Sequence, residues 1–437
     1  MKICLLMISF LILGIILNIV NYSLFLKLLS IIWYLASVLI IYLAIKYSCL
    51  FKFKQFKIKD FIKGIKSKSQ NEVSPMSSLS MSLAAKIGVG SLSGVALALY
   101  FGGVGSIFWM CLISMFVSIN TYVECILGIK YREKIGNNLV GGPSFYIKKC
   151  LGNKYLSILY SILVIITYSG LFLSIQSNTI VNVINNYHIS SIIIVLILTL
   201  CTFLIIRKNS NNIFLVDSIL VPMMIIFYVI LGIYVIINSH NILIIFKLMI
   251  KEAFNIKSII PVFLIGMQRA IFISESGIGT SAISASACDN DPSKQGMLEI
   301  LGIYITTFLV CFVTFIIIAT SNYQMIDFQN TNGIDLVMYA FNYHFGSFGQ
   351  IILTIITTLF AFSTIISSYF FGENNLKIFT SNKKIINLFK IIVLIIIAIS
   401  GFVSPIFLWN LTDYFIAILV IINISSIIRI GKKRVYN

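Results

Sequence analysis

The sequence predicts an all-α integral membrane protein of about twelve transmembrane helices: a five-plus-five inverted repeat with two broken helices, preceded by two extra N-terminal helices. Of the 437 residues, 59% are hydrophobic and 11% are charged, and the mean hydropathy is +1.01. Apolar runs of about 20 residues, the length that spans a bilayer, recur along the chain. Two of these runs are interrupted by glycines next to charged residues, which is typical of membrane folds built from paired repeats.

The apolar runs define the twelve expected spans. They cover residues 4–22, 30–50, 79–102, 104–128, 155–180, 190–206, 213–238, 257–286, 297–320, 346–371, 385–402 and 406–428. The first run follows Lys2, as in a signal peptide, but no small-residue cleavage site follows it cleanly. We therefore predict a retained first helix.

The formal net charge of +18 comes from basic loops between the apolar runs, so it indicates membrane topology and no nucleic-acid partner. With twelve spans, the basic segments 52–75, 130–154, 207–208, 377–384 and 429–434 all fall on one side of the membrane. Since basic loops stay in the cytoplasm, we expect a multi-pass protein of the plasma (inner) membrane with both termini cytoplasmic. The residues 321–345 are expected to form an outer loop.

Five parts follow from this topology. They are N-terminal transmembrane helices (1–51), a basic cytoplasmic loop (52–75), a first inverted repeat (76–238), an outer amphipathic connector (239–256), and a second inverted repeat with a basic cytoplasmic tail (257–437).

The first broken segment, Leu83–Gly94, reads LAAKIGVGSLSG and contains a lysine that costs about 2.5–3.5 kcal/mol near the bilayer centre. Unwinding at Gly88–Ser91 would expose backbone N–H groups to a carboxylate. The carbonyl groups that end the preceding half-helix, near Ala84–Ile87, would favour a cation such as sodium. A zwitterionic amino acid with a co-transported cation fits both ends.

The second broken segment, Arg269–Ser281, reads RAIFISESGIGTS. It places Arg269 and Glu275 inside an apolar run, where each needs a partner on another helix, either as a structural pair or in coupling. Glu124, which precedes basic residues at a helix end, is expected to be solvated or interfacial.

Polar residues also occur in two other apolar runs. Ser363 and Thr364 form an adjacent hydroxyl pair, which could bind an ion or bond to its own helix. Gln176 and Asn178 should face the bundle interior, as ligands or in helix–helix hydrogen bonds.

Other classes of protein lack support in the sequence. The eight cysteines include no close pair, and the three histidines have no metal-ligand spacing, so we expect no enzyme, cofactor, disulfide or resident metal. No repeated filter loop indicates a channel, and no stretch is long enough for a soluble sensor domain.

Several motifs together resemble the alanine or glycine:cation symporter family, also called the sodium:alanine symporter family. The matching stretches are Ser74–Pro75 followed by LAAKIGVGSLSGVA and FGGVGSIFWM, then TYVECILGIKYREK, GGPSFYIKKCLG, SIQSN, RAIFISESGIGTSAI with Gln295–Gly296 after it, and FAFSTI with YFFGE. They occur in the family's order between about residues 74 and 373.

The resemblance implies an amino-acid transporter fold, a small neutral amino acid such as alanine or glycine as substrate, and sodium as the coupling ion. It implies substrate contacts at Gly88, Gly90, Ser91 and Gln176, with the region of Gly277 and Gly279 and the pocket wall at Ser368. It implies an ion site made of the Ala84 and Ile87 carbonyl groups and the Ser363 and Thr364 hydroxyl groups.

The chain also departs from the family pattern. The usual GTGNIAG is GVGSLSG here, a threonine before it is Lys86, a tryptophan is Ser368, and an aspartate is Thr306. The loss of the tryptophan would fit a substrate larger than alanine. Lys86 leaves an alternative open: its ammonium could replace a bound cation, which would make the carrier sodium-independent or proton-coupled, or it could be a structural partner of Glu275 or of a helix-end carbonyl.

Overall fold

The computed structural model describes residues 13–18, 20–69, 71–136, 138–207, 210–323 and 333–436. The first half of this part contains α2 (Tyr22–Leu50), η1 (Lys54–Phe56), α3 (Ile58–Ile65), α4 (Pro75–Lys86), η2 (Val89–Ser91), α5 (Ser93–Gly102), α6 (Gly105–Lys130), β1 (Glu133–Ile135), β2 (Asn138–Val140), α7 (Pro143–Leu151), α8 (Lys154–Ile166), η3 (Thr167–Phe172), α9 (Leu173–Asn185), α10 (Ser191–Ile206) and α11 (Ser210–Asn238). The second half contains α12 (Ile242–Ala253), α13 (Ile259–Ser274), α14 (Thr280–Ser286), α15 (Pro292–Tyr304), η4 (Ile305–Cys311), α16 (Phe312–Ala319), α17 (Gly333–Phe345), η7 (Gly346–Phe348), α18 (Gly349–Leu376), α19 (Lys383–Ser400) and α20 (Pro405–Tyr436).

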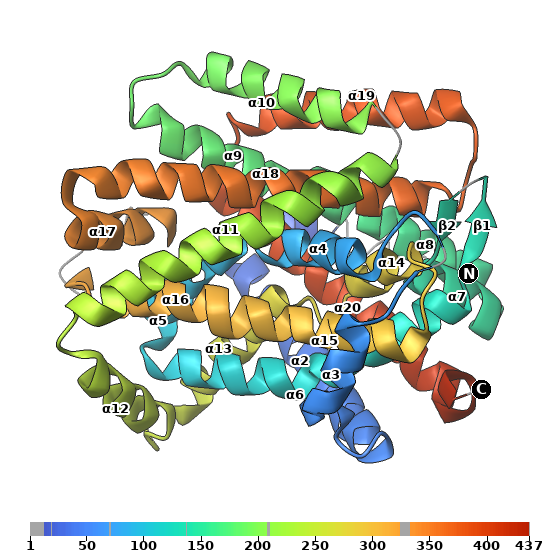
Figure 1. Cartoon of the computed structure of the whole chain (residues 1–437), viewed down its shortest axis with the longest axis horizontal. Helices are drawn as coiled ribbons and strands as arrows, with labels where there is room; N and C mark the ends of the chain where they lie inside the picture. The colour runs from blue at the N-terminus through green and yellow to red at the C-terminus, as the bar shows by residue number, and fades with distance from the viewer. Residues whose placement is uncertain are drawn as a thin grey trace.

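Helices make up nearly all of this fold (Figure 1). Within the described ranges the one sheet is the antiparallel hairpin β1–β2, in which Glu133 pairs with Val140. Seven described helical stretches are long and apolar enough to cross a membrane, and an eighth is the pair α4 and η2–α5, bent by 61° at its break. These features confirm an all-α membrane protein. The count of twelve spans and the inverted repeat stay predictions.

The predicted outer loop 321–345 contains a helix, α17, whose buried Ile334, Val337 and Phe341 lie on one face. Its short length and polar residues hid it from a search for long apolar runs. Most of the predicted span 4–22 lies outside the described residues.

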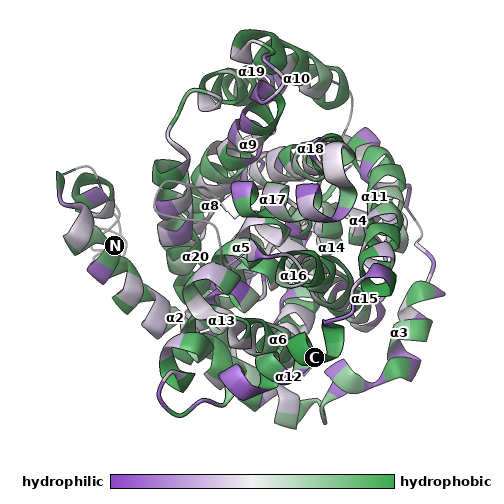
Figure 2. Ribbon diagram, turned by 90° about the vertical axis from the view of Figure 1, so that its left-hand side faces the viewer, coloured by the Kyte–Doolittle hydropathy of each residue, from purple (hydrophilic) through white to green (hydrophobic). Residues whose placement is uncertain are grey.

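The bundle buries hydroxyl side chains on α4 and α14 within its apolar core and exposes apolar side chains on its outside, which is the arrangement that a lipid environment favours. Figure 2 views the helices from their ends: α4 and α14 lie in the middle, while α10 and α19 pack together at the margin. On α11, Ile219, Ile226 and Ile230 are exposed by 57–68% and face outward. Helix α6 packs against α13, α14 and α15, and α18 packs against α4, α9 and α11. The second broken segment therefore packs against α6, and the first packs against α18.

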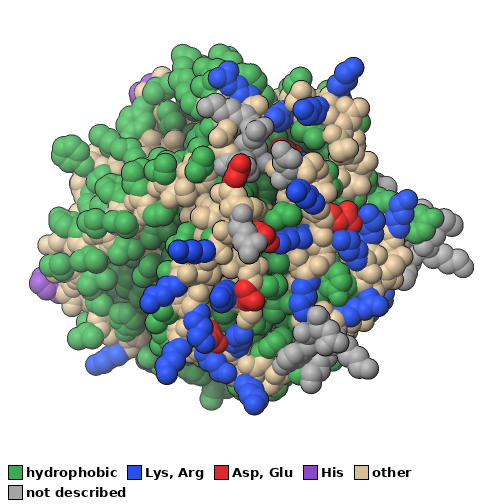
Figure 3. All heavy atoms as spheres, turned by 45° about the vertical axis from the view of Figure 1, so that its right-hand side comes forward, with side chains coloured by type: hydrophobic (Ala, Val, Ile, Leu, Met, Phe, Trp, Pro, Cys, Tyr) green, Lys and Arg blue, Asp and Glu red, His purple; other side chains and the backbone are tan. Residues whose placement is uncertain are grey.

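The basic side chains gather at one end of the bundle (Figure 3). A pocket of about 1020 Å³ opens there, and its wall includes Lys134, Arg207, Lys377, Lys383 and Lys390. Loops predicted from charge to share one side of the membrane therefore contribute to one pocket.

Candidate functional site

The first broken helix separates at Gly88. The amide of Ile87 still donates to the Leu83 carbonyl at 2.7 Å, but Gly88 is extended, with φ −102° and ψ −159°, so the α-helix ends there. A short 3₁₀ turn follows, and α5 resumes at Ser93. A Cβ atom on Gly88 would lie 2.6 Å from the Thr364 hydroxyl oxygen, so only glycine allows this close approach.

Two side chains from distant helices reach this break. Gln176 of α9 accepts a hydrogen bond from the Val89 amide at 3.0 Å through Oε1, while its buried Nε2 has no partner among the described residues. Thr364 of α18 is 2.7 Å from the Ala84 carbonyl, to which its hydroxyl donates. Within the break itself, the Ser91 hydroxyl donates to the Gly88 carbonyl at 2.8 Å.

The structure thus brings Ala84, Gly88, Gln176 and Thr364 together, although they come from three helices that are far apart in the sequence. We call this group the first-break cluster. It presents an amide N–H₂ donor that has no partner among the described residues and a carbonyl–hydroxyl oxygen pair, all buried inside the bundle. The first can bind a carboxylate, and the second provides the oxygen ligands that sodium takes.

Other predicted residues lie beside this cluster or point away from it. Ile87 and Gly90 flank Gly88, and Gly90 lies under the ring of Phe272. Ser363 points toward α11, with its hydroxyl 3.9 Å from the sulfur of Met224. The hydroxyl of Ser368 is buried and has no partner among the described side chains, while its carbonyl accepts a bond from Ser169 at 3.0 Å.

The second break has a different geometry. Glu275, Gly277 and Gly279 all have positive φ, at 50°, 91° and 98°. A Cβ atom on Gly279 would lie 2.2 Å from the ring of Pro143, and one on Gly277 would face Ile40 of α2 at 3.2 Å. Both glycines therefore pack against neighbouring helices, and neither is brought to the first-break cluster.

Side chains satisfy the carbonyl groups of this second break. Tyr160 donates to the Ile278 carbonyl, and Asn423 donates to the Gly277 carbonyl at 2.9 Å. Glu275 accepts from Tyr168 at 3.0 Å and from Thr280 at 2.7 Å, so its expected partner on another helix is a tyrosine.

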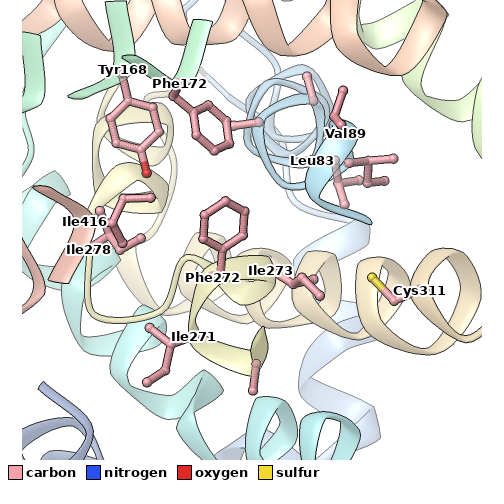
Figure 4. Close-up of a cluster of buried hydrophobic side chains, with 14 of the residues drawn as sticks. Leu83, Val89, Tyr168, Phe172, Ile271, Phe272, Ile273, Ile278, Cys311 and Ile416 are labelled. Carbon is pink, nitrogen blue, oxygen red and sulfur yellow. The ribbon is translucent and has the colours of Figure 1, made fainter. Parts of the chain in front are cut away.

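Phe272 lies between the two breaks (Figure 4). Its ring centroid is 5.9 Å from that of Phe172 on η3 and 5.6 Å from that of Trp409 on α20. Arg269 lies over the same ring at 5.9 Å and interacts electrostatically with Asp413 of α20. An aromatic layer with one cation therefore covers the first-break cluster from the side of α13.

Lys86 is fully buried, and its partner is one that the sequence did not indicate. The ammonium lies 3.5 Å from the Glu299 carboxylate of α15, donates to the Ser281 hydroxyl at 2.8 Å, and contacts the Ser82 hydroxyl. Glu275, the expected partner, interacts with this ammonium electrostatically but forms its hydrogen bonds with Tyr168 and Thr280. The hydrogen bonds of the ammonium go to hydroxyl groups and not to a helix-end carbonyl. The charge is compensated between α4 and α15, away from Thr364 on α18.

Glu124 corrects another expectation. It is 0% exposed and accepts a hydrogen bond from Asn423 at 2.7 Å, so it is neither solvated nor interfacial. Sequence reasoning also missed Asp217, Glu299 and Asp413, all buried. The signal was available, because each is a carboxylate inside or beside a predicted span, where such groups are rare and functional.

A helical membrane protein with a broken helix at its centre, polar groups facing that break, and a pocket opening toward one end has the organisation of a secondary transporter. The comparison with known proteins agrees. The profile of the sodium:alanine symporter family matches residues 16–436, and the chain belongs to this family, whose members are transporters and not enzymes.

Three similar proteins are named as amino-acid carriers or sodium symporters. The amino-acid carrier protein AlsT of Bacillus subtilis is 29% identical over 91% of this chain and 87% of its own length. The probable sodium/glutamine symporter GlnT of the same organism is 29% identical over 91% and 86%. The sodium/alanine symporter AgcS of Methanococcus maripaludis is 27% identical over 79% of each chain.

Proposed function

We propose that this chain imports a small neutral amino acid, alanine or glycine, together with sodium across the plasma membrane by alternating access. The observation that carries the proposal is the first-break cluster. The Nε2 of Gln176, which has no partner among the described residues, and the amide groups of Gly88 and Gly90 would hold the substrate carboxylate. The carbonyl groups of Ala84 and Ile87 and the hydroxyl of Thr364 would hold sodium.

The names of the relatives support cation-coupled amino-acid transport. The size of the substrate is a further part of the proposal. Ser368 stands where the family usually has tryptophan, and its hydroxyl, which has no partner among the described residues, adds a polar group beside Ser169 of η3. A serine leaves room for a side chain larger than a methyl group, so a panel should extend from glycine through alanine to glutamine.

Alternating access would use the two ends of the bundle in turn. The pocket at the basic end supports an inward route, and the aromatic layer around Phe272 would close the opposite route. Both termini would lie in the cytoplasm, on the side of the basic loops.

The test is uptake of labelled amino acids by purified protein in liposomes, with sodium outside or replaced by choline. Sodium-dependent accumulation of alanine or glycine is expected. Counterflow, in which unlabelled substrate inside drives entry of label, separates a carrier from a channel. Uptake that is linear in concentration, without counterflow, would contradict the proposal.

A second candidate is a sodium-independent or proton-coupled carrier in which Lys86 supplies a permanent positive charge. The burial of this ammonium near the first break is the observation that favours it. Transport that proceeds equally in choline and is lost in Lys86→Thr would support it. Strict sodium dependence would exclude it, and the ammonium's position against Glu299 rather than Thr364 is why we rank it second.

A further inference from the structure

Asp217 is a buried carboxylic acid inside a membrane helix, without a hydrogen-bond partner among the described residues. It is 0% exposed, and neither carboxyl oxygen has a hydrogen-bond partner in the part of the chain that the structure describes. A charged carboxylate in such a place is costly. An acid that only stabilised the fold would have a donor or a cation beside it, so the isolation of Asp217 requires another explanation.

The position of Asp217 on α11 is fixed by its neighbours along one buried face. Phe214, one turn before it, contacts Phe370 of α18 at 5.0 Å between ring centroids. Met224, two turns after it, contacts Ser363 of α18 at 3.9 Å. Because residues three, four and seven apart share a helix face, Asp217 faces inward between these two contacts.

This place lies between the first-break cluster and the open pocket. Helix α11 packs against both α4 and α18, the helices that contribute Ala84 and Thr364. Phe214 and Phe370 also line the pocket of about 1020 Å³ at the basic end. Asp217 is therefore one helical turn from the pocket, on the side of the bundle where the carbonyl–hydroxyl pair is found.

The other ionisable groups on the elements packed against α11 are engaged elsewhere or lie in the pocket wall. Lys86 of α4 faces Glu299, and Tyr369 of α18 and Lys377, which follows α18, both bond to Glu373. Arg207, which follows α10, lines the pocket, Cys201 of α10 is exposed, and Cys311 of η4 is a buried thiol. None of these described groups forms a hydrogen bond or an ion pair with Asp217.

We propose that Asp217 is a monovalent-cation site on the route between the first-break cluster and the basic pocket. Its carboxyl group holds a proton in the absence of sodium, and a sodium ion displaces that proton. The carboxylic acid and Na⁺ give the sodium carboxylate and H⁺, and the proton leaves to water in the pocket. Each state is neutral overall, which is what the apolar surroundings require. The inference deepens the proposed sodium coupling and rests on it for its role in transport.

The direct test measures protons and needs no amino acid. Sodium chloride is added to purified protein in weakly buffered detergent solution containing a pH-sensitive dye, with choline chloride as the reference. The natural chain should release protons on sodium addition. Asp217→Asn should reduce this release by about tenfold or more, since a side-chain amide does not ionise and has no proton to release to sodium. Ser218→Ala, a neighbour whose hydroxyl bonds to its own helix, should release protons as the natural chain does. Equal release from Asp217→Asn, or no release from the natural chain, would overturn the proposal.

A melting curve separates this role from a structural one. Removing an unpaired buried carboxyl group should leave the melting temperature of Asp217→Asn and Asp217→Leu equal to or above that of the natural chain. A marked drop in both variants would show that the carboxyl has a stabilising partner and would contradict the proposal.

Uptake assays distinguish failure of this inference from failure of the proposed function. Sodium-driven alanine uptake with unchanged proton release in Asp217→Asn would refute the site and leave the transporter intact. Proton release that depends on Asp217, in a protein that accumulates none of the amino acids, would keep the site and refute the substrate.

Discussion

The two glycine-broken helices look alike in sequence and differ in what surrounds them. At the first break, Gly88 is extended and the side chains of Gln176 and Thr364 approach the backbone. The Nε2 of Gln176 has no partner in the described part of the chain. At the second, three residues adopt positive φ, and Tyr160 and Asn423 bond to the carbonyl groups that the turn exposes. The first break retains unused bonding capacity, and the second is satisfied by its neighbours.

This difference separates ligand binding from support. A site for a transported solute needs donors and acceptors that are unpaired, or weakly paired, in the empty state. The second break has those groups occupied by residues of α8 and α20, so it is built to hold a fixed turn. Glycine is required at both breaks for separate reasons: close approach at Gly88 and left-handed backbone at Gly277 and Gly279.

The largest effect should come from filling the space at the first break. In Gly88→Val, the added side chain would collide with Thr364 and Gln176, whose oxygens lie 2.6 and 3.0 Å from the first added atom. We expect complete loss of amino-acid uptake. Gly94→Ala is the matched control, because a Cβ on Gly94 meets nothing within 4 Å. Uptake by Gly88→Val at the level of Gly94→Ala would show that the first break is not part of the binding site.

Lys86 connects the two broken helices and should matter for stability. Its ammonium lies 3.5 Å from Glu299 and bonds to Ser281 of α14. Lys86→Met leaves a buried carboxylate without its counter-charge, so the free energy of unfolding should fall by about 3–5 kcal/mol. Lys63→Met, which breaks the exposed pair with Asp60, should change it by about 1 kcal/mol or less.

Denaturant or thermal melts of both variants measure this contrast. The double variant Lys86→Met with Glu299→Gln should recover part of the loss, since no unpaired charge remains. A stability of Lys86→Met equal to that of Lys63→Met would show that the buried charge pair is not what joins the helices.

The sequence predicted the fold class, most helix positions and both breaks, because apolar run length and glycine placement are local signals. It also indicated Gln176 and Thr364, but a linear pattern cannot tell which side of a helix a residue faces. Ser363 and Thr364 are adjacent, yet only Thr364 reaches Ala84. The Lys86–Glu299 pair was missed for the same reason, since the partner is 213 positions away on α15.

At the second break, a smaller and purely structural effect is expected. Tyr160→Phe removes the hydroxyl that donates to the Ile278 carbonyl and leaves that buried acceptor unpaired. The free energy of unfolding should decrease by about 1–3 kcal/mol. The sodium concentration for half-maximal uptake should stay unchanged, because this turn does not reach the first-break cluster. Tyr155→Phe, at an exposed tyrosine, serves as the control. A sodium response altered only in Tyr160→Phe would show that the second break belongs to the ion site.

The sharpest comparison uses the two adjacent hydroxyls of α18. Thr364→Val keeps the shape of the side chain and removes the oxygen 2.7 Å from the Ala84 carbonyl. The sodium concentration for half-maximal uptake should rise by about tenfold, which corresponds to about 1.4 kcal/mol of lost binding energy. Ser363→Ala removes a hydroxyl that faces Met224 and bonds to its own helix, so the same measurement should give the value of the natural chain. If Ser363→Ala shifts the sodium response and Thr364→Val does not, the ion lies between α18 and α11, and the first break holds the amino acid alone.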